Sequence, residues 1–250
     1  MAIEVTVLGS SGGYPAAGKA CSSFLLSRGR ENLVLDLGSG ALSNLFKYLA
    51  PDEIGGLAIT HMHYDHYVDI FGLCTARKFW KTKLKPLPVI LPIGGSDALL
   101  SVISQNSRES FLECLDIREA GPGEKANIGN FEIFTGAAKH IENSLIFRVR
   151  AGGHTVCYSG DTDMTGELEE LAHECNLLIC EATFTSEVPS RFFGHLFAEE
   201  AGRVASKAGV QMLLLTHIWP TLSEVRALED ARKHYHGKVE LAREGLKMMI

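Results

Sequence analysis

The feature that most constrains this chain is a dense run of metal-type ligands behind a short apolar segment. His61, His63, Asp65 and His66 lie within six residues and directly follow the stretch 55–60. Side chains two residues apart in an extended segment project to the same side, so His61 and His63 are expected to point together. Asp65 and His66 then come around the following turn. One ion could not readily take all four, but two adjacent ions could. The run predicts a metal site rather than a polar loop of solvated histidines.

Length, composition and charge limit the class of protein. The 250 residues, 46% of them hydrophobic, can bury a substantial core and are interpreted as one domain over 1–250. A net charge of −6 with mixed signs does not favour extended nucleic acid as the substrate. No stretch is long enough to span a bilayer, and no signal-peptide pattern precedes the strand-like segment 3–8, so a cytoplasmic protein without membrane contact is expected. The six cysteines include no CxxC pair and are assigned no chemical role. A homodimer is possible.

Short apolar runs alternate with helical patterns, which predicts an α/β (α+β) fold built as a four-layer αββα sandwich. The expected strands are 5–8, 23–26, 32–35, 57–60, 88–91, 131–136, 144–149, 155–159, 177–179, 212–216 and 238–241. The expected helices are 39–49, 67–80, 97–104, 166–175, 198–208 and 224–235. Thr221 and Glu224 have the spacing of a capping box at the start of the last helix.

Ligand-type residues follow the ends of four of these strands. The residues are His61, His140, Asp161 and His217. Loops at the carboxyl ends of strands are where α/β sheets usually place their sites, because the sheet fixes positions while the loops supply chemistry. Four strands that end in this way predict one shared site.

Seven side chains fill two coordination spheres. The first ion is expected to take His61, His63 and His140, and the second Asp65, His66 and His217, with Asp161 between them. A water shared by two dications would have a pKa near neutrality, and the resulting hydroxide is the expected nucleophile. Two divalent ions are therefore predicted. Mixed imidazole and carboxylate ligation suits zinc, manganese or iron, and zinc is the first choice.

The run 61–66, with the three later ligands, resembles the metallo-β-lactamase superfamily. The stretches 181–184 (E-A-T-F) and 194–196 (G-H-L) are similar to its ribonuclease Z-like branch, as are the opening loop 8–15 and the aspartate motif 34–40. This resemblance implies a phosphodiesterase-like metal-dependent hydrolase.

By the same resemblance, His195 is the general acid that protonates the leaving oxygen, and Glu181 orients it. Asp65 is placed with them among the catalytic residues. Alternatively, His195 only leads into a helix and Glu181 only caps the next segment. Asp36 either holds a ligand imidazole in its tautomer or simply starts a turn.

The reaction follows from the charge of the site. Two dications against two carboxylates and one hydroxide leave about one positive charge, which favours an anionic phosphodiester. Ribonuclease Z enzymes carry a long arm between their third and fourth metal motifs, but only twenty residues separate His140 from Asp161. The short interval from Asp161 to Glu181 has no room for a cap domain, and Cys180 stands where a histidine often precedes the glutamate. A small or short phosphodiester, such as a cyclic or oligonucleotide, is therefore expected in place of precursor tRNA.

Other activities stay open. A ribonuclease Z-type tRNA 3′-processing endonuclease is one, and a thioester or lactone hydrolase of the same fold is another, although the segments around Glu181 and His195 count against the second. A di-iron redox or storage protein would usually carry a glutamate at the position of His63. True β-lactamase activity is disfavoured because Asp65 is atypical of those enzymes.

Overall fold

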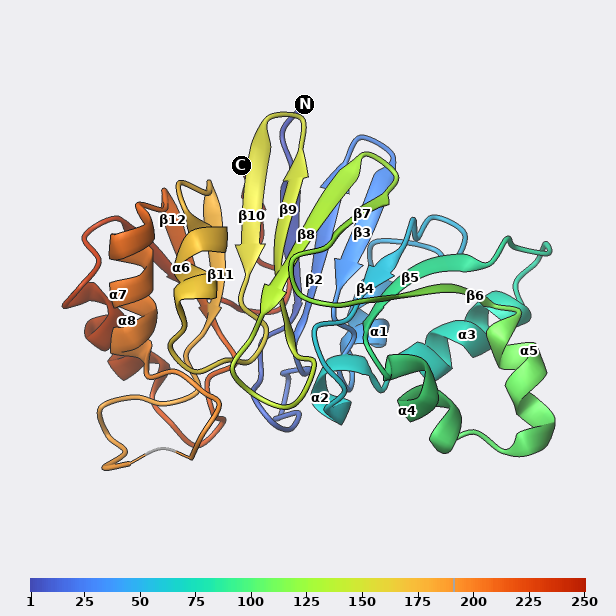
Figure 1. Cartoon of the computed structure of the whole chain (residues 1–250), viewed down its shortest axis with the longest axis horizontal. Coiled ribbons are helices and arrows are strands. Elements are labelled where there is room, and N and C mark those ends of the chain that lie inside the picture. Colours follow the sequence, from blue (N-terminus) through green and yellow to red (C-terminus); the bar gives the residue numbers. More distant parts are fainter. Residues whose placement is uncertain (191) are drawn as a thin grey trace.

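Two seven-stranded β-sheets face each other, and helices cover the outer face of each (Figure 1). The computed structural model describes residues 1–190 and 192–250. The strand order is β14-β1-β2-β3-β4-β5-β6 in the first sheet and β13-β12-β11-β10-β9-β8-β7 in the second. The predicted αββα sandwich is confirmed.

The first sheet is antiparallel at one end and parallel at the other, because hairpins join β1 to β3 and helical crossovers join β3 to β6. Its strands are β1 (Glu4–Gly9), β2 (Ser23–Arg28), β3 (Glu31–Leu35), β4 (Leu57–Ala58), β5 (Leu87–Pro92), β6 (Leu115–Ala120) and β14 (Lys247–Met249). The helical segments of this half are α1 (Ala41–Leu45), α2 (Tyr64–Tyr67), α3 (Ile70–Lys78), α4 (Gly95–Ser101), η1 (Gln105–Ser107) and α5 (Arg108–Leu112).

The second sheet repeats this plan, with antiparallel pairing from β7 to β10 and parallel pairing from β10 to β13. Its strands are β7 (Lys125–Ile128), β8 (Phe131–Ala137), β9 (Leu145–Ala151), β10 (His154–Tyr158), β11 (Leu177–Glu181), β12 (Met212–Thr216) and β13 (Lys238–Leu241). The helices that cover it are α6 (Gly166–Ala172), α7 (Ala198–Ala208) and α8 (Glu224–Arg232).

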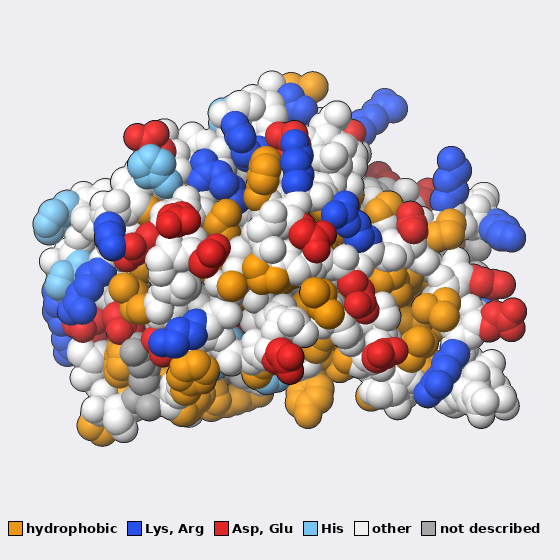
Figure 2. Space-filling view, viewed as in Figure 1, with side chains coloured by type: hydrophobic (Ala, Val, Ile, Leu, Met, Phe, Trp, Pro, Cys, Tyr) orange, Lys and Arg blue, Asp and Glu red, His pale blue; other side chains and the backbone are white. Residues whose placement is uncertain are grey.

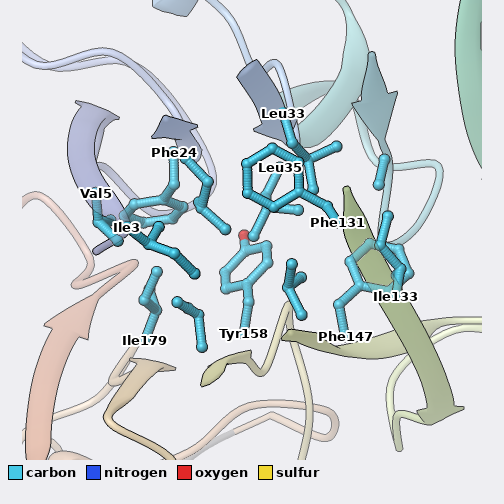
Figure 3. Packing of buried hydrophobic residues seen from close by; sticks show 14 of the residues in the cluster. Ile3, Val5, Phe24, Leu33, Leu35, Phe131, Ile133, Phe147, Tyr158 and Ile179 are labelled. Carbon is cyan, nitrogen blue, oxygen red and sulfur yellow. The ribbon is translucent and has the colours of Figure 1, made fainter. Parts of the chain in front are cut away.

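The core between the sheets is built from inward-facing side chains of both (Figure 3). Phe24 of the first sheet packs edge-on against Tyr158 of the second, with ring centroids 5.2 Å apart. Burying one large apolar side chain contributes about 1.5–3 kcal/mol, so this layer holds the two sheets in a fixed relation. Loops from both sheets then meet at one edge of the sandwich, the lower edge in Figure 1.

Each expected strand and helix has a counterpart, but β6, β7 and β14 are not among the expected strands. All three are outermost strands, so each pairs with only one neighbour. β7 and β14 have only four and three residues, and exposed residues in β6 and β7 interrupt the apolar pattern. Edge strands of this kind lack the buried run from which strands are recognised.

The predicted capping box of α8 is wrong. The N-cap is Ser223, whose side chain accepts a hydrogen bond from the Arg226 amide at 3.2 Å. Thr221 lies two residues before this cap, so it is too early to pair with Glu224, the first helical residue.

In the described part of the chain, no helix is both long and apolar enough to cross a membrane. The cytoplasmic location and the homodimer stay predictions.

Candidate metal centre

The seven predicted ligands converge at the edge where loops from the two sheets meet. Two groups made up of these ligands have potential ligand atoms within 4.8 Å of one another, and a third such group, Glu181, His195 and His217, adjoins them. One group is His61, His63, His140 and Asp161, and the other is Asp65, His66, His217 and Asp161. Asp161 belongs to both, which is the arrangement expected of a bridging carboxylate.

The spacing inside the first group suits a small cation. The Nδ1 atom of His63 lies 3.2 Å from Nε2 of His61 and 3.0 Å from Nε2 of His140. Oδ2 of Asp161 lies 3.6 Å from Nε2 of His61. Tetrahedral zinc with bonds of about 2.0–2.1 Å separates its ligand atoms by about 3.3 Å, so these four atoms fit such an ion.

The second group has the same spacing and two unsatisfied atoms. Nε2 of His217 lies 3.2 Å from Oδ2 of Asp65 and 3.3 Å from Oδ2 of Asp161. Nε2 of His66 and Oδ1 of Asp161 are 3.3 Å apart, and both are buried without a hydrogen bond of normal geometry. A buried polar atom without a partner costs about 1–3 kcal/mol, and a cation between these atoms would remove that cost.

Burial sets the charge of the first group. It lowers the pKa of His61 well below its usual value, lowers that of His63, and lowers that of His140 to about 4. The three imidazoles are therefore neutral near pH 7, and a neutral ring nitrogen is the form that binds a metal.

His66 lies in a strongly negative field. Its burial lowers the pKa of the imidazole, but three carboxylates outweigh this effect and raise the pKa well above its usual value. They belong to Asp161, Asp36 and Asp65. A site that favours a positive charge on His66 also favours a metal cation in its place.

His66 is oriented through Asp36, which lies directly after β3. Nδ1 of His66 lies 2.7 Å from Oδ2 of Asp36, so Nε2 faces the other ligands. Asp36 also accepts hydrogen bonds from the Tyr158 hydroxyl at 2.7 Å and from the amide and hydroxyl of Thr60 at 2.7 and 2.8 Å. Of the two interpretations of Asp36, the structure favours the partner of a ligand imidazole over a simple turn residue.

His140 is oriented by a backbone carbonyl that needs glycine. Its Nδ1 lies 2.9 Å from the carbonyl oxygen of Gly194, which leaves Nε2 to face His63. Gly194 has φ +93°, and a Cβ there would lie 2.5 Å from Nδ1 of His140. The position therefore excludes other residues without a shift of the ligand.

Thr183 connects His217 to the predicted acid pair. Its hydroxyl donates to Oε2 of Glu181 at 2.6 Å and lies 2.8 Å from Nδ1 of His217. Because the hydroxyl hydrogen is already engaged with the carboxylate, the Thr183 oxygen accepts a hydrogen bond from Nδ1–H of His217, whose Nε2 then faces Asp65 and Asp161.

His195 lies against this ligand and is held by Glu181. The imidazole rings of His195 and His217 stack with centroids 5.5 Å apart and an interplanar angle of 13°. Nδ1 of His195 lies 3.1 Å from Oε1 of Glu181 and 4.0 Å from Oδ2 of Asp161. Burial lowers the pKa of His195, but the Glu181 carboxylate outweighs it and raises the pKa to about 9.

Glu181 makes the contacts that both interpretations of this residue require. It is buried at the end of β11 and accepts hydrogen bonds from the Thr162 amide at 2.7 Å and the Leu196 amide at 3.1 Å. It therefore fixes two loops and also contacts His195.

The structure brings all nine predicted site residues together, but their roles stay predictions. Sequence reasoning missed the positioning contacts of Thr60, Tyr158, Thr183 and Gly194. Thr183 lies inside the E-A-T-F stretch and Gly194 inside the G-H-L stretch, so each had a signal without an assigned role. In the sequence, nothing distinguishes Tyr158 from the other residues of an apolar strand.

A four-layer sandwich with two adjoining clusters of imidazoles and carboxylates at one edge defines a metal-binding α/β protein of the metallo-β-lactamase fold. Residues 32–218 match the family described as "Beta-lactamase superfamily domain". The chain therefore belongs to the β-lactamase superfamily.

Relatives agree over the full length of the chain. It is 30% identical to the probable metallo-hydrolase YhfI of Bacillus subtilis over 97% of this chain and 98% of that protein. The crystal structure of YhfI matches with a TM-score of 0.91 at 27% identity and covers both chains completely. A ribonuclease Z of Haloferax volcanii is 26% identical over 100% of this chain and 96% of that protein. The chain groups with proteins named as metallo-hydrolases and ribonucleases.

Proposed function

We propose that this chain, as one domain over residues 1–250, is a two-metal hydrolase that cleaves small or short nucleotide phosphodiesters. The ligand spacing described above suits zinc, while manganese and iron remain compatible with the donor set. The name of the ribonuclease Z relative supports a phosphodiester substrate. We expect the enzyme to act in the cytoplasm.

The observation that carries this proposal is the buried pair of His195 and Glu181 beside the ligand cluster. Glu181 accepts a hydrogen bond from the Nδ1–H group of His195, so Nε2 of His195 is the atom that would protonate a leaving oxygen. An alkoxide leaves poorly without a proton, and a positioned acid contributes about 10²–10⁴-fold. The thiolate of a thioester needs this help less, so the pair favours a phosphodiester.

The two ligand groups, joined by Asp161, would hold the two ions. Divalent ions held there would supply polarisation of the phosphoryl oxygens and a nucleophilic water near neutral pH. The chain orients the ligands through Asp36, Thr183 and Gly194. Two of these ligands, Asp161 and His217, are themselves buried.

The size of the substrate is inferred from the segment between the third and fourth ligand motifs. From His140 to Asp161 the chain makes only the β9–β10 hairpin. The alignment with the Haloferax enzyme runs over 305 positions against 250 residues here, so that relative contains insertions. Acidic and basic side chains are interspersed on the face in Figure 2, without a continuous basic track. These features support a short diester.

The test compares leaving groups. We expect metal-loaded His195→Ala to lose about 10²–10⁴-fold of its kcat/KM on a dinucleoside monophosphate, whose leaving group is an alkoxide. It should lose under about tenfold on bis(p-nitrophenyl) phosphate, because p-nitrophenolate leaves without a proton. Asp161→Ala should abolish both activities and lower the metal content. Equal losses of His195→Ala on both substrates, or faster hydrolysis of a thioester or lactone, would contradict the proposal.

A further inference from the structure

Exposed aromatic side chains lie directly beside the predicted acid. We call Tyr14, Phe192 and Trp219 the aromatic patch. Phe192 is 54% exposed and Tyr14 is 41% exposed, whereas Trp219 is half-buried. Figure 2 shows exposed hydrophobic side chains along the lower margin of the molecule, the edge at which the loops after β8 and β11 lie in Figure 1.

The patch is continuous with the metal centre through Phe192. The ring of Phe192 contacts that of His195 with centroids 5.5 Å apart, and it contacts Trp219 at 5.8 Å. The buried ring of Phe184 packs edge-on against that of Phe192, with centroids 4.9 Å apart. The ring of Tyr14 contacts that of Trp219, with centroids 5.7 Å apart.

The loops that orient the ligands also fix the patch. The amide of Trp219 donates to the carbonyl oxygen of Thr183 at 3.2 Å. The amide of Gly13, next to Tyr14, donates to Oδ2 of Asp65 at 2.9 Å. A group that rests on these rings is therefore held at a fixed position relative to the ligands and His195.

We propose that the aromatic patch binds the base of the leaving nucleoside by stacking. This inference rests on the proposed function and specifies its substrate as a diester whose departing group carries a nucleobase. Phe192 touches the residue that would protonate the leaving oxygen, so the group attached to that oxygen is the one that reaches the patch. A base offers a flat apolar face to such rings, whereas a simple alkyl group does not.

The first test measures selectivity. The probes are thymidylyl-(3′→5′)-thymidine and two analogues, each lacking one of the two bases. We expect removal of the leaving-side base to lower kcat/KM by about 5- to 100-fold, the range that stacking on aromatic side chains contributes. Phe192→Leu should reduce this ratio towards one, while Phe192→Tyr should keep it.

Phe193→Leu is the matched control. Phe193 is also exposed, but its ring lies under the Lys139 ammonium at 5.5 Å. We expect this variant to keep the preference for the base. Equal kcat/KM for all three probes in the wild type, or an equal loss in Phe192→Leu and Phe193→Leu, would overturn the inference.

A second test needs no turnover. The chain has two tryptophans, so Trp80→Phe leaves Trp219 as the one tryptophan fluorophore. Adenosine monophosphate should quench this fluorescence and ribose 5-phosphate should not. Phe192→Leu in the same background should raise the apparent Kd for adenosine monophosphate by about fivefold or more.

The two failures are distinguishable. If the metal-loaded protein hydrolyses neither the dinucleotide nor bis(p-nitrophenyl) phosphate, the proposed function fails and the leaving-group assignment fails with it. If it hydrolyses both but adenosine monophosphate and ribose 5-phosphate give the same quenching, only the stacking inference is wrong.

Discussion

Asp36 shows how one buried carboxylate can control a ligand. Its Oδ2 faces three donors, from His66, Tyr158 and the Thr60 hydroxyl, and its Oδ1 faces the Thr60 amide. In Asp36→Asn, either orientation of the amide places an NH₂ group against a donor. We expect metal affinity to fall by about 10–100-fold, measured by competition with a chelator.

Tyr158→Phe is the milder partner of that experiment. It removes one donor to Asp36 but creates no clash, so we expect a loss of about 1 kcal/mol in the free energy of unfolding and under about tenfold in metal affinity. A larger effect on metal affinity in Tyr158→Phe than in Asp36→Asn would contradict this ranking.

The ligands could be predicted from the sequence because four of them are packed into residues 61–66 and the others follow apolar strands. The role of Tyr158 could not. Its hydroxyl contacts the carboxylate of Asp36, which lies 122 positions away and follows a strand of the other sheet. Only the packing of the two sheets brings these residues together. Thr183 is a similar case, since its hydroxyl links three residues that are separate in the sequence.

The start of α8 allows a direct comparison of the predicted and observed caps. The Ser223 hydroxyl accepts a hydrogen bond from the Arg226 amide, whereas Thr221 precedes the N-cap. Ser223→Ala should lower the free energy of unfolding by about 1 kcal/mol, measured in urea, because an N-cap satisfies a free helix amide. Thr221→Ala should change it by less than about 0.5 kcal/mol. Equal losses would restore Thr221 as a capping residue.

In the described part of the chain, the interior strands could be predicted, whereas of the outermost strands only β13 could and β6, β7 and β14 could not. β10 and β12 are buried on both faces, so their residues form continuous apolar runs. β14 has three residues, Lys247–Met249, and exists because its backbone pairs with β1. Pairing between the two ends of the chain depends on the closed fold, and nothing local to residues 247–249 encodes it.

The metal centre should also stabilise the sandwich. His61 and His66 follow β4 of the first sheet, while His140, Asp161 and His217 follow strands of the second. Ions held by both would bind the folded state alone, which contributes about 4 kcal/mol at a free metal concentration of about 1,000 times Kd. We expect chelation to lower the Tm by roughly 10 °C.

The control for this experiment is Asp161→Asn, which should start near the Tm of the metal-free protein and change little on chelation. Metal analysis should give about two ions per chain in the wild type, as expected for two-metal sites. A single ion per chain, with an unchanged Tm after its removal, would contradict the two-metal arrangement.

Charge and shape together set the expected response to a large RNA. Tight binding of extended nucleic acid requires many cation contacts to phosphates, and its affinity falls by about 10³–10⁵ between about 50 and 200 mM salt. This chain has a net charge of −6 and a short β9–β10 hairpin between its third and fourth ligand motifs. We therefore expect precursor tRNA to be cleaved with a kcat/KM no higher than that of a dinucleotide, and with little dependence on salt. Efficient, strongly salt-dependent cleavage of precursor tRNA would show that surfaces outside the metal centre recognise RNA, and the restriction to short diesters would then be wrong.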